Sequence, residues 1–160
     1  MKSRWNIRGI KSAIIRLLAI YAAALGINYL WEMAQMPLYQ NMPFDDISAY
    51  LICLRASFGD ANITIIIFGI GLLLFKSWYW PKKLTILKAA YLVVSGGVTA
   101  IGIELIALNR GSWTYTQLMP LIPVLRIGLV PLVQLMILPY LSYLISIRTP
   151  AYTDREKATE

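Results

Sequence analysis

Residues 84–108 read LTILKAAYLVVSGGVTAIGIELIAL, and Lys88 and Glu104 are the only charged side chains among them. Because a helix needs about 20 apolar residues to cross a bilayer, this run predicts a transmembrane helix. Gly97, Ala100 and Glu104 share one face of that helix, and small residues let membrane helices approach each other closely. The sequence therefore places an acid where a neighbouring helix is expected to pack.

Three more runs have similar length and composition, and they cover Ser12–Gln35, Ala61–Trp80 and Pro123–Ile147. Of the 160 residues, 58% are hydrophobic and 14% are charged, whereas a soluble domain carries about 45–50% apolar and about 25% charged residues. We predict an all-α integral membrane protein, a four-transmembrane-helix bundle that forms a single domain over residues 1–160. Residues 1–11 and 148–160 would be its tails. The first run is longer than a signal-peptide core of about 7–15 residues, which predicts a retained anchor.

Basic residues are distributed unequally between the two sides of this predicted bundle. The chain has 15 lysines and arginines, and only Arg55, Arg110 and Arg126 fall on the side opposite the termini. Since cytoplasmic segments of membrane proteins carry an excess of Lys and Arg, both termini are predicted to be cytoplasmic. The expected location is the cell (inner) membrane. Topology thus accounts for the net charge of +7, and nucleic acid is not an expected partner.

The connection between the first two runs contains its own apolar pattern. Within residues 42–58, apolar side chains recur at helical spacing, at Ile47, Tyr50, Leu51, Leu54 and Phe58. This pattern is typical of a short amphipathic helix on a membrane surface, and Asp45 or Asp46 would cap its start.

Missing residue types exclude several chemistries. The chain has no histidine, which excludes a histidine base and a histidine metal site, and its one cysteine, Cys53, cannot form an internal disulfide. There is no glycine-rich phosphate loop followed by lysine. Carboxylates alone can hold magnesium or calcium, but no spaced double-aspartate motif is present. We therefore predict neither a metal nor a cofactor.

Polar side chains within the four runs gather toward one side of the predicted bundle. Ionisable residues inside a membrane usually face the bundle interior and mark functional sites. The candidate catalytic residues are the acids Glu104, Glu32 and Asp60. The candidate substrate-binding residues are Gln35, Arg110, Trp113, Tyr115, Arg126, Gln134 and Asn28. An apolar pocket with a few convergent polar groups is the usual form of a ligand site.

Two interpretations of this cluster remain open. In the functional one, one carboxyl donates a proton while another stays ionised, and the rings of Trp31, Trp113 and Tyr115 stabilise a developing cation. That combination suits an isoprenoid or another lipid alkene. In the structural one, the acids only fix the bundle: Glu104 pairs with Arg126, or with Arg110, and Asp60 caps the second transmembrane helix.

The stretch Glu104 to Pro120, with Gly111-Ser-Trp113-Thr-Tyr115 at its centre, resembles an acid–Gly–x–Trp–x–aromatic pattern in small membrane carotene cyclases. The resemblance implies a membrane fold and cation chemistry on an isoprenoid. It covers less than a fifth of the chain, and the paired Pro-x-Glu element of those enzymes is absent.

Three classes of function are compatible with the sequence. The first is a membrane enzyme or binding protein for a lipid-soluble substrate. The second is an accessory subunit of a membrane complex, because the chain is small and rich in small-residue faces. The third is an ion-coupled transporter, which would need a homo-oligomer to enclose a path. Membrane lipids, a lipid-soluble substrate and a membrane protein partner are the corresponding expected partners.

Overall fold

The computed structural model describes residues 7–148, and the side chains of residues 11–148. It contains four long helices in antiparallel order: α1 (Ile7–Gln35), α2 (Ile47–Phe75), α3 (Ile86–Asn109) and α4 (Leu129–Ser146). A short 3-10 helix, η1 (Met36–Leu38), follows α1 directly. All four long helices are apolar and long enough to cross a membrane, as the sequence predicts, and the described residues contain no β-strand.

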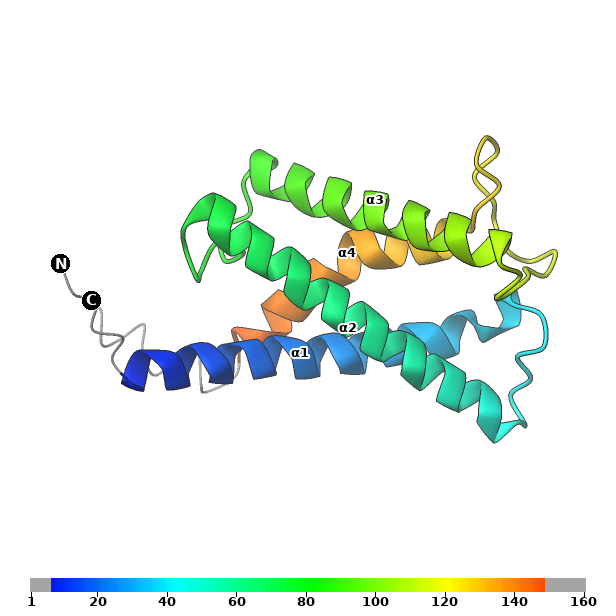
Figure 1. The fold of residues 1–160 in the computed structure, drawn as a ribbon, viewed down its shortest axis with the longest axis horizontal. Helices are drawn as coiled ribbons and strands as arrows, with labels where there is room; N and C mark the ends of the chain where they lie inside the picture. The colour runs from blue at the N-terminus through cyan, green and yellow to red at the C-terminus, as the bar shows by residue number, and fades with distance from the viewer. Residues whose placement is uncertain (1–6, 149–160) are drawn as a thin grey trace.

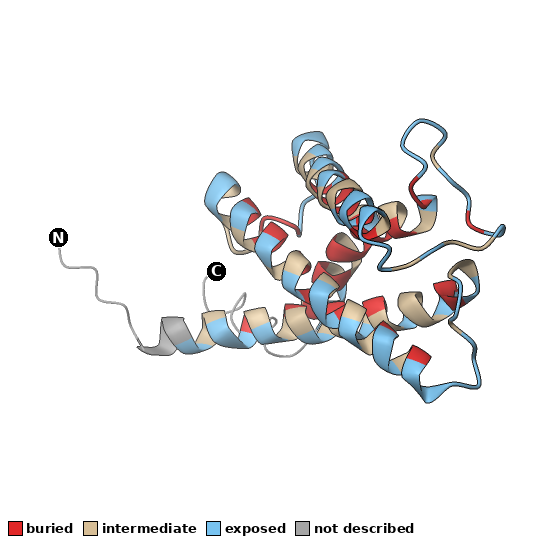
Figure 2. Cartoon of the chain, turned by 45° about the vertical axis from the view of Figure 1, so that its right-hand side comes forward, coloured by how far each residue is buried: buried red, intermediate tan, exposed pale blue. Residues whose placement is uncertain are grey.

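The helices are arranged around α4 and α1, as Figure 1 shows. α1 packs against α2 and α4, and α3 packs mainly against α4. α2 and α3 share few contacts and diverge toward the end of the bundle that carries residues 36–46 and 110–128. We call that end the pocket end. Buried residues lie on the sides of the helices that face one another (Figure 2). Large apolar side chains such as Leu73 and Val98 are exposed, and lipid would cover them.

The opposite end of the bundle is held by an aromatic core. Trp80 lies in the α2–α3 connection and packs against Phe68, Tyr91 and Tyr143. Its indole nitrogen donates a hydrogen bond to the Phe68 carbonyl at 3.3 Å, and a Cβ added at Gly71 would overlap its ring. The core therefore depends on a glycine that lets a tryptophan fold back onto α2.

Close contact between α3 and α4 depends on Gly96. A Cβ at this position would overlap the backbone carbonyl of Leu135, so only glycine permits this approach. At the neighbouring Gly97, an added Cβ would lie 3.8 Å from Met136, which is an ordinary contact. The small-residue face predicted for residues 84–108 thus packs against α4, but Gly96 alone sets the distance between α3 and α4.

Both predicted boundaries of the second transmembrane helix are wrong. Residues 47–58 do not form a separate interfacial helix, because they are the first turns of α2, which continues without interruption to Phe75. Small residues explain this continuity, since Ala49, Cys53 and Ser57 share one face and are buried. α2 then ends because Lys76 adopts a left-handed conformation (φ 51°), well before Trp80.

The fourth helix begins later than predicted. Residues 121–128 form a hairpin in which Ile122 donates a backbone hydrogen bond to Ile127 at 2.9 Å, and α4 starts only at Leu129. At the other end of the chain, residues 7–11 belong to α1 rather than to a tail. The rest of the predicted tails, residues 1–6 and 149–160, lies outside the described residues.

Candidate functional site

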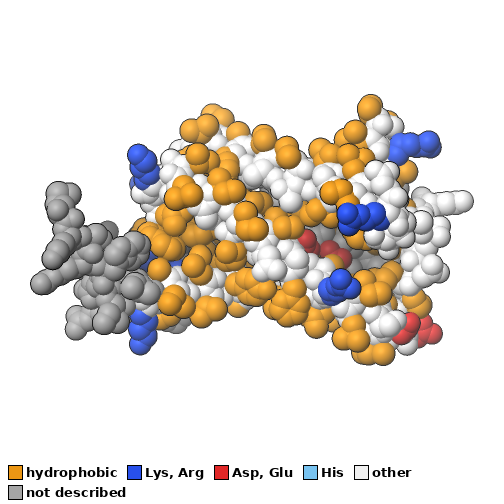
Figure 3. Space-filling model, viewed as in Figure 1, with side chains coloured by type: hydrophobic (Ala, Val, Ile, Leu, Met, Phe, Trp, Pro, Cys, Tyr) orange, Lys and Arg blue, Asp and Glu red, His pale blue; other side chains and the backbone are white. Residues whose placement is uncertain are grey.

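A cavity of about 490 Å³ lies at the pocket end, between all four helices. Its walls combine apolar side chains with the three acids expected from the sequence, Glu32 of α1, Asp60 of α2 and Glu104 of α3. Figure 3 shows acidic side chains inside a hollow at this end, with hydrophobic side chains around it and basic side chains close to its edge. Gln35, Trp113 and Gln134, three of the predicted substrate-binding residues, also line the cavity.

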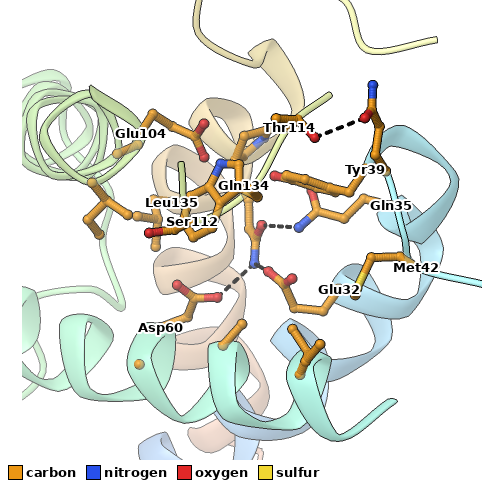
Figure 4. Close-up of a pocket in the computed structure, with 18 of the residues that line it drawn as sticks. Glu32, Gln35, Tyr39, Met42, Asp60, Glu104, Ser112, Thr114, Gln134 and Leu135 are labelled. Atoms are coloured by element: carbon orange, nitrogen blue, oxygen red, sulfur yellow. Dashed lines mark hydrogen bonds between the residues drawn. The ribbon is translucent and has the colours of Figure 1, made fainter. Parts of the chain in front are cut away.

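Gln134 of α4 is the polar centre of the cavity wall, as the close-up in Figure 4 shows. Its amide nitrogen donates to Glu32 Oε1 at 2.9 Å, to Asp60 Oδ2 at 2.9 Å and to Asn28 Oδ1 at 3.0 Å. Its amide oxygen accepts a hydrogen bond from Gln35 Nε2 at 3.2 Å. These five residues, Asn28, Glu32, Gln35, Asp60 and Gln134, are called the Gln134 cluster below.

The Gln134 cluster contains more acceptors than donors. An amide nitrogen carries two hydrogens, so it can satisfy only two of its three neighbouring oxygens at once. Gln35 adds another acceptor, because its side chain is only 4% exposed and its Oε1 has no hydrogen-bond partner. The cluster is therefore complete only when a proton or a donating ligand is added.

Asn28 supports the cluster from behind. It is fully buried, does not line the cavity, and donates its side-chain N–H to the Ala24 carbonyl at 2.8 Å. This bond turns its oxygen toward Gln134. Asn28 is therefore a positioning residue rather than part of the cavity surface.

Glu104 lies on the α3 side of the cavity, apart from the Gln134 cluster (Figure 4). Its side chain is 3% exposed and accepts a hydrogen bond from the Tyr115 hydroxyl. That hydroxyl accepts in turn from the backbone N–H of Gly128 at 3.0 Å. Tyr115 does not line the cavity, so it acts by holding Glu104 and tying it to the start of α4.

Two loop segments close the cavity at the pocket end. The Thr116 N–H donates to Leu38 at 2.9 Å and the Gln40 N–H donates to Thr114 at 2.9 Å, which pairs residues 38–40 with 114–116. This pairing brings the ring of Tyr39 to 6.2 Å from that of Trp113, centre to centre. Burial raises the pKa of Tyr39, and nearby carboxyls add to the shift, so its hydroxyl stays protonated.

The arginines do not take the places expected for them. Arg110 and Arg126 are exposed, neither lines the cavity, and Glu104 bonds to Tyr115 instead. Among the described residues, none that lines the cavity is a lysine or an arginine. Arg126 lies in the hairpin, where its left-handed conformation (φ 54°) belongs to the turn. The cavity thus holds three carboxyl groups without a cationic side chain in its wall.

The capping role considered for Asp60 is wrong, because Asp60 lies in the middle of α2. The cap of α2 is Asp46, whose carboxylate accepts from the Ser48 backbone N–H at 2.8 Å. Asp60 instead points into the cavity toward Gln134 (Figure 4). Among the described residues, no three acidic or cysteine side chains lie close enough together to hold a metal ion.

Sequence reasoning missed the loop residues that line the cavity, above all Tyr39, Ser112 and Thr114. The only available signal was the mixture of aromatic and polar residues in both connections. Comparison with known proteins adds no assignment, since no family model, curated protein or solved structure matches this chain. The function is therefore inferred from the geometry of the cavity.

Proposed function

We propose that this chain is a membrane-embedded binding protein whose cavity takes a lipid-soluble ligand from the outer half of a cell (inner) membrane. The observation that carries the proposal is a cavity with a largely apolar wall and a few convergent polar groups, inside a bundle whose outer surface is apolar. Ligand pockets of about 300–1,000 Å³ with apolar walls and a few convergent polar groups are the usual form of small-molecule sites.

The entrance supports a ligand that arrives from the lipid. α2 and α3 share few contacts and diverge toward the pocket end, and the exposed residues of these two helices that line the cavity are Ile52, Gly59 and Ile103, which we take as its rim. All three residues are exposed and none is polar in its side chain. An apolar rim between two transmembrane helices favours entry of a hydrocarbon chain sideways from the bilayer over entry of a water-soluble solute.

The side of the membrane follows from charge. The end opposite the cavity carries Lys76, Lys82, Lys83 and Lys88, whereas the basic residues described at the pocket end are Arg55, Arg110 and Arg126. Under the positive-inside rule, the pocket end is therefore the external one. This orientation puts both termini in the cytoplasm and the cavity in the outer leaflet.

A reaction at this site would use Glu104. Its carboxyl faces the cavity from the helix opposite the Gln134 cluster and is held by a hydrogen bond from Tyr115. It could transfer a proton to or from a bound ligand while the carboxyls of the Gln134 cluster bind another part of it. Binding is the primary proposal, and catalysis is a second step that depends on it.

To test binding, a large side chain is placed at the entrance of the cavity. Gly59 is exposed at the rim, and a Cβ there meets nothing within 4 Å, so Gly59→Phe should fold and obstruct the cavity. Gly69→Phe is the matched control, because Gly69 also has free space, lies on the same helix and does not line the cavity. Mass spectrometry of both variants and the wild type, purified from native membranes in mild detergent, measures the lipids and proteins that remain bound.

We expect one enriched lipid in the wild type and in Gly69→Phe, and its loss in Gly59→Phe. A lipid retained equally by all three proteins would contradict binding in this cavity. A stoichiometric protein partner lost only in Gly59→Phe would instead indicate that a partner helix fills the gap between α2 and α3, and that the chain is a subunit of a complex.

A further inference from the structure

In the Gln134 cluster the acceptors outnumber the donors, and this imbalance indicates which chemical groups of a ligand would bind there. Three oxygens surround the two hydrogens of the Gln134 amide, and Gln35 Oε1 lies buried without any donor. A buried acceptor without a partner costs free energy, so the Gln134 cluster favours a ligand group that brings N–H or O–H donors. The unpartnered donor of the wall, Trp113 Nε1, lies on the loop side of the cavity, away from this cluster. Gln35 is an amide, which makes this observation independent of the acids.

The charged groups of the cavity wall restrict the class of ligand further. Glu32, Asp60 and Glu104 all line the cavity, and none of its lining residues is a lysine or an arginine. Electrostatic interactions are strong at this depth, because the surrounding medium has a low dielectric constant. A cationic group at the Gln134 cluster would therefore be attracted by the carboxyls of Glu32 and Asp60 when they are ionised, whereas a carboxylate or phosphate would be repelled.

The cavity wall also offers aromatic faces. Tyr39 and Trp113 line it on the loop side, and ring faces attract cations through their quadrupole. The acids do not form a compact metal site, since no three of them lie close enough together in the described part of the chain. Groups that are spread around a cavity suit an extended organic cation better than a small ion.

We propose that the ligand carries an ammonium head, which binds the Gln134 cluster, and a hydrocarbon tail, which leaves between α2 and α3. This inference rests on the proposed function and adds the class of ligand. The N–H groups of the ammonium donate to the oxygens that the two hydrogens of the Gln134 amide cannot satisfy. In this arrangement the head binds Gln35 Oε1 and the carboxyls of Glu32 and Asp60. The tail contacts Ile52, Ile63 and Ile103, which line the cavity toward its rim.

Photocrosslinking with three matched probes tests the ligand class. The full chain is reconstituted into phosphatidylcholine nanodiscs with a dodecyl amine, dodecyl alcohol or dodecanoic acid, each with a diazirine in the tail and each at the same mole fraction. Mass spectrometry then measures labelling of the peptides that contain residues 52–63 and 100–104. The amine should label them about tenfold more strongly than the alcohol, and the acid least, because charge-assisted hydrogen bonds are the strong ones.

Paired variants locate the source of this preference. In Glu32→Gln combined with Asp60→Asn, the ratio of amine to alcohol should fall to about threefold or less, because the shapes remain and the charges are removed. Asp45→Asn combined with Asp46→Asn is the control, since these acids lie at the same end but outside the cavity lining. Asp60→Asn alone replaces the double variant if the latter does not give a monodisperse, helical protein.

Each other outcome counts against the inference in a different way. Equal labelling by all three probes that disappears in Gly59→Phe would overturn the ammonium head and leave the binding function intact. An amine preference that survives in the double variant would also overturn it, since the preference would then come from elsewhere. No labelling of the cavity peptides by any probe would overturn both proposals.

Discussion

The side-chain amide of Gln134 in α4 donates a 2.9 Å hydrogen bond to the carboxyl of Asp60 in α2. α2 and α4 otherwise share few contacts, among them a 3.0 Å hydrogen bond from the Tyr143 hydroxyl to the Thr64 carbonyl, so the Gln134–Asp60 bond contributes part of the link between them at the pocket end. The same nitrogen also contacts Glu32 and Asn28 of α1. One residue therefore joins three helices and forms the wall of the cavity, which couples the stability of the bundle to the state of its site.

Replacement of Gln134 by leucine should destabilise the protein. Leucine removes the donor and strands the oxygen of Asn28, which is fully buried and cannot reach water. A stranded buried acceptor costs about 1–3 kcal/mol, which thermal unfolding in detergent would measure. Gln40→Leu is the control, because its hydrogen bonds are exposed, and it should cost less. Equal losses in the two variants would contradict a central role for Gln134.

Alanine substitutions at the adjacent residues Gly96 and Gly97 should change the stability of the protein by very different amounts. Gly96→Ala places a Cβ on the backbone carbonyl of Leu135, so α3 must move away from α4 and the free energy of unfolding should fall by about 1–3 kcal/mol. Gly97→Ala adds a Cβ 3.8 Å from Met136, which should change stability by less than about 0.5 kcal/mol. Unfolding of both variants by heat in the same detergent measures the difference. Similar values would show that the close approach is not rigid.

The existence of the helices could be predicted from hydropathy, because a chain in lipid must satisfy its backbone polar groups within helices. The start of α2 could not be predicted in this way. Its apolar stripe at Ile47, Leu51 and Phe58 is exposed, while Ala49 and Cys53 are buried against α1. Inside a membrane the small residues face the bundle and the large ones face lipid, which reverses the rule that suggested an interfacial helix.

The acids and amides of the cavity could be predicted because polar side chains within apolar helices must face one another. Glu32, Asp60, Glu104 and Gln134 all meet this expectation in the cavity wall. The positions of the loops could not be predicted, since they depend on backbone pairing of residues 38–40 with 114–116, which leaves no periodic pattern. The expected ion pair of Glu104 with Arg126 or Arg110 was wrong for the same reason, since the positions of these arginines also depend on the loops.

The cap of α2 should lose its contribution to stability in acid. The side-chain hydroxyl and the backbone N–H of Ser48 donate to Asp46 and lower its pKa. Because the pKa of Asp46 is lower in the folded protein, its charged carboxylate stabilises the helix start fully above the ordinary pKa of about 3.9. This stabilisation is lost as pH falls through the lower pKa of the folded protein. Hydrogen exchange of residues 47–50, corrected for intrinsic rates, should therefore accelerate below about pH 4.

Asp46→Asn provides the control for this acid effect. Asparagine is also a good N-cap but does not titrate, so protection of residues 47–50 should be independent of pH in the variant. Wild type and variant should then differ by a constant amount at higher pH and converge in acid. An identical pH profile for the two proteins would show that another group governs the opening of this helix end.

Removal of the Tyr115 hydroxyl should affect both the bundle and its site. Tyr115→Phe leaves Glu104 without its hydrogen bond and the Gly128 N–H without an acceptor, both of them buried, at a cost of about 1–3 kcal/mol. Tyr50→Phe is the matched control, because its hydroxyl donates to Phe44 at the surface. Thermal unfolding compares the two, and crosslinking of the amine probe reports the site. A variant as stable as Tyr50→Phe, with unchanged labelling, would show that Glu104 does not depend on Tyr115 for its position.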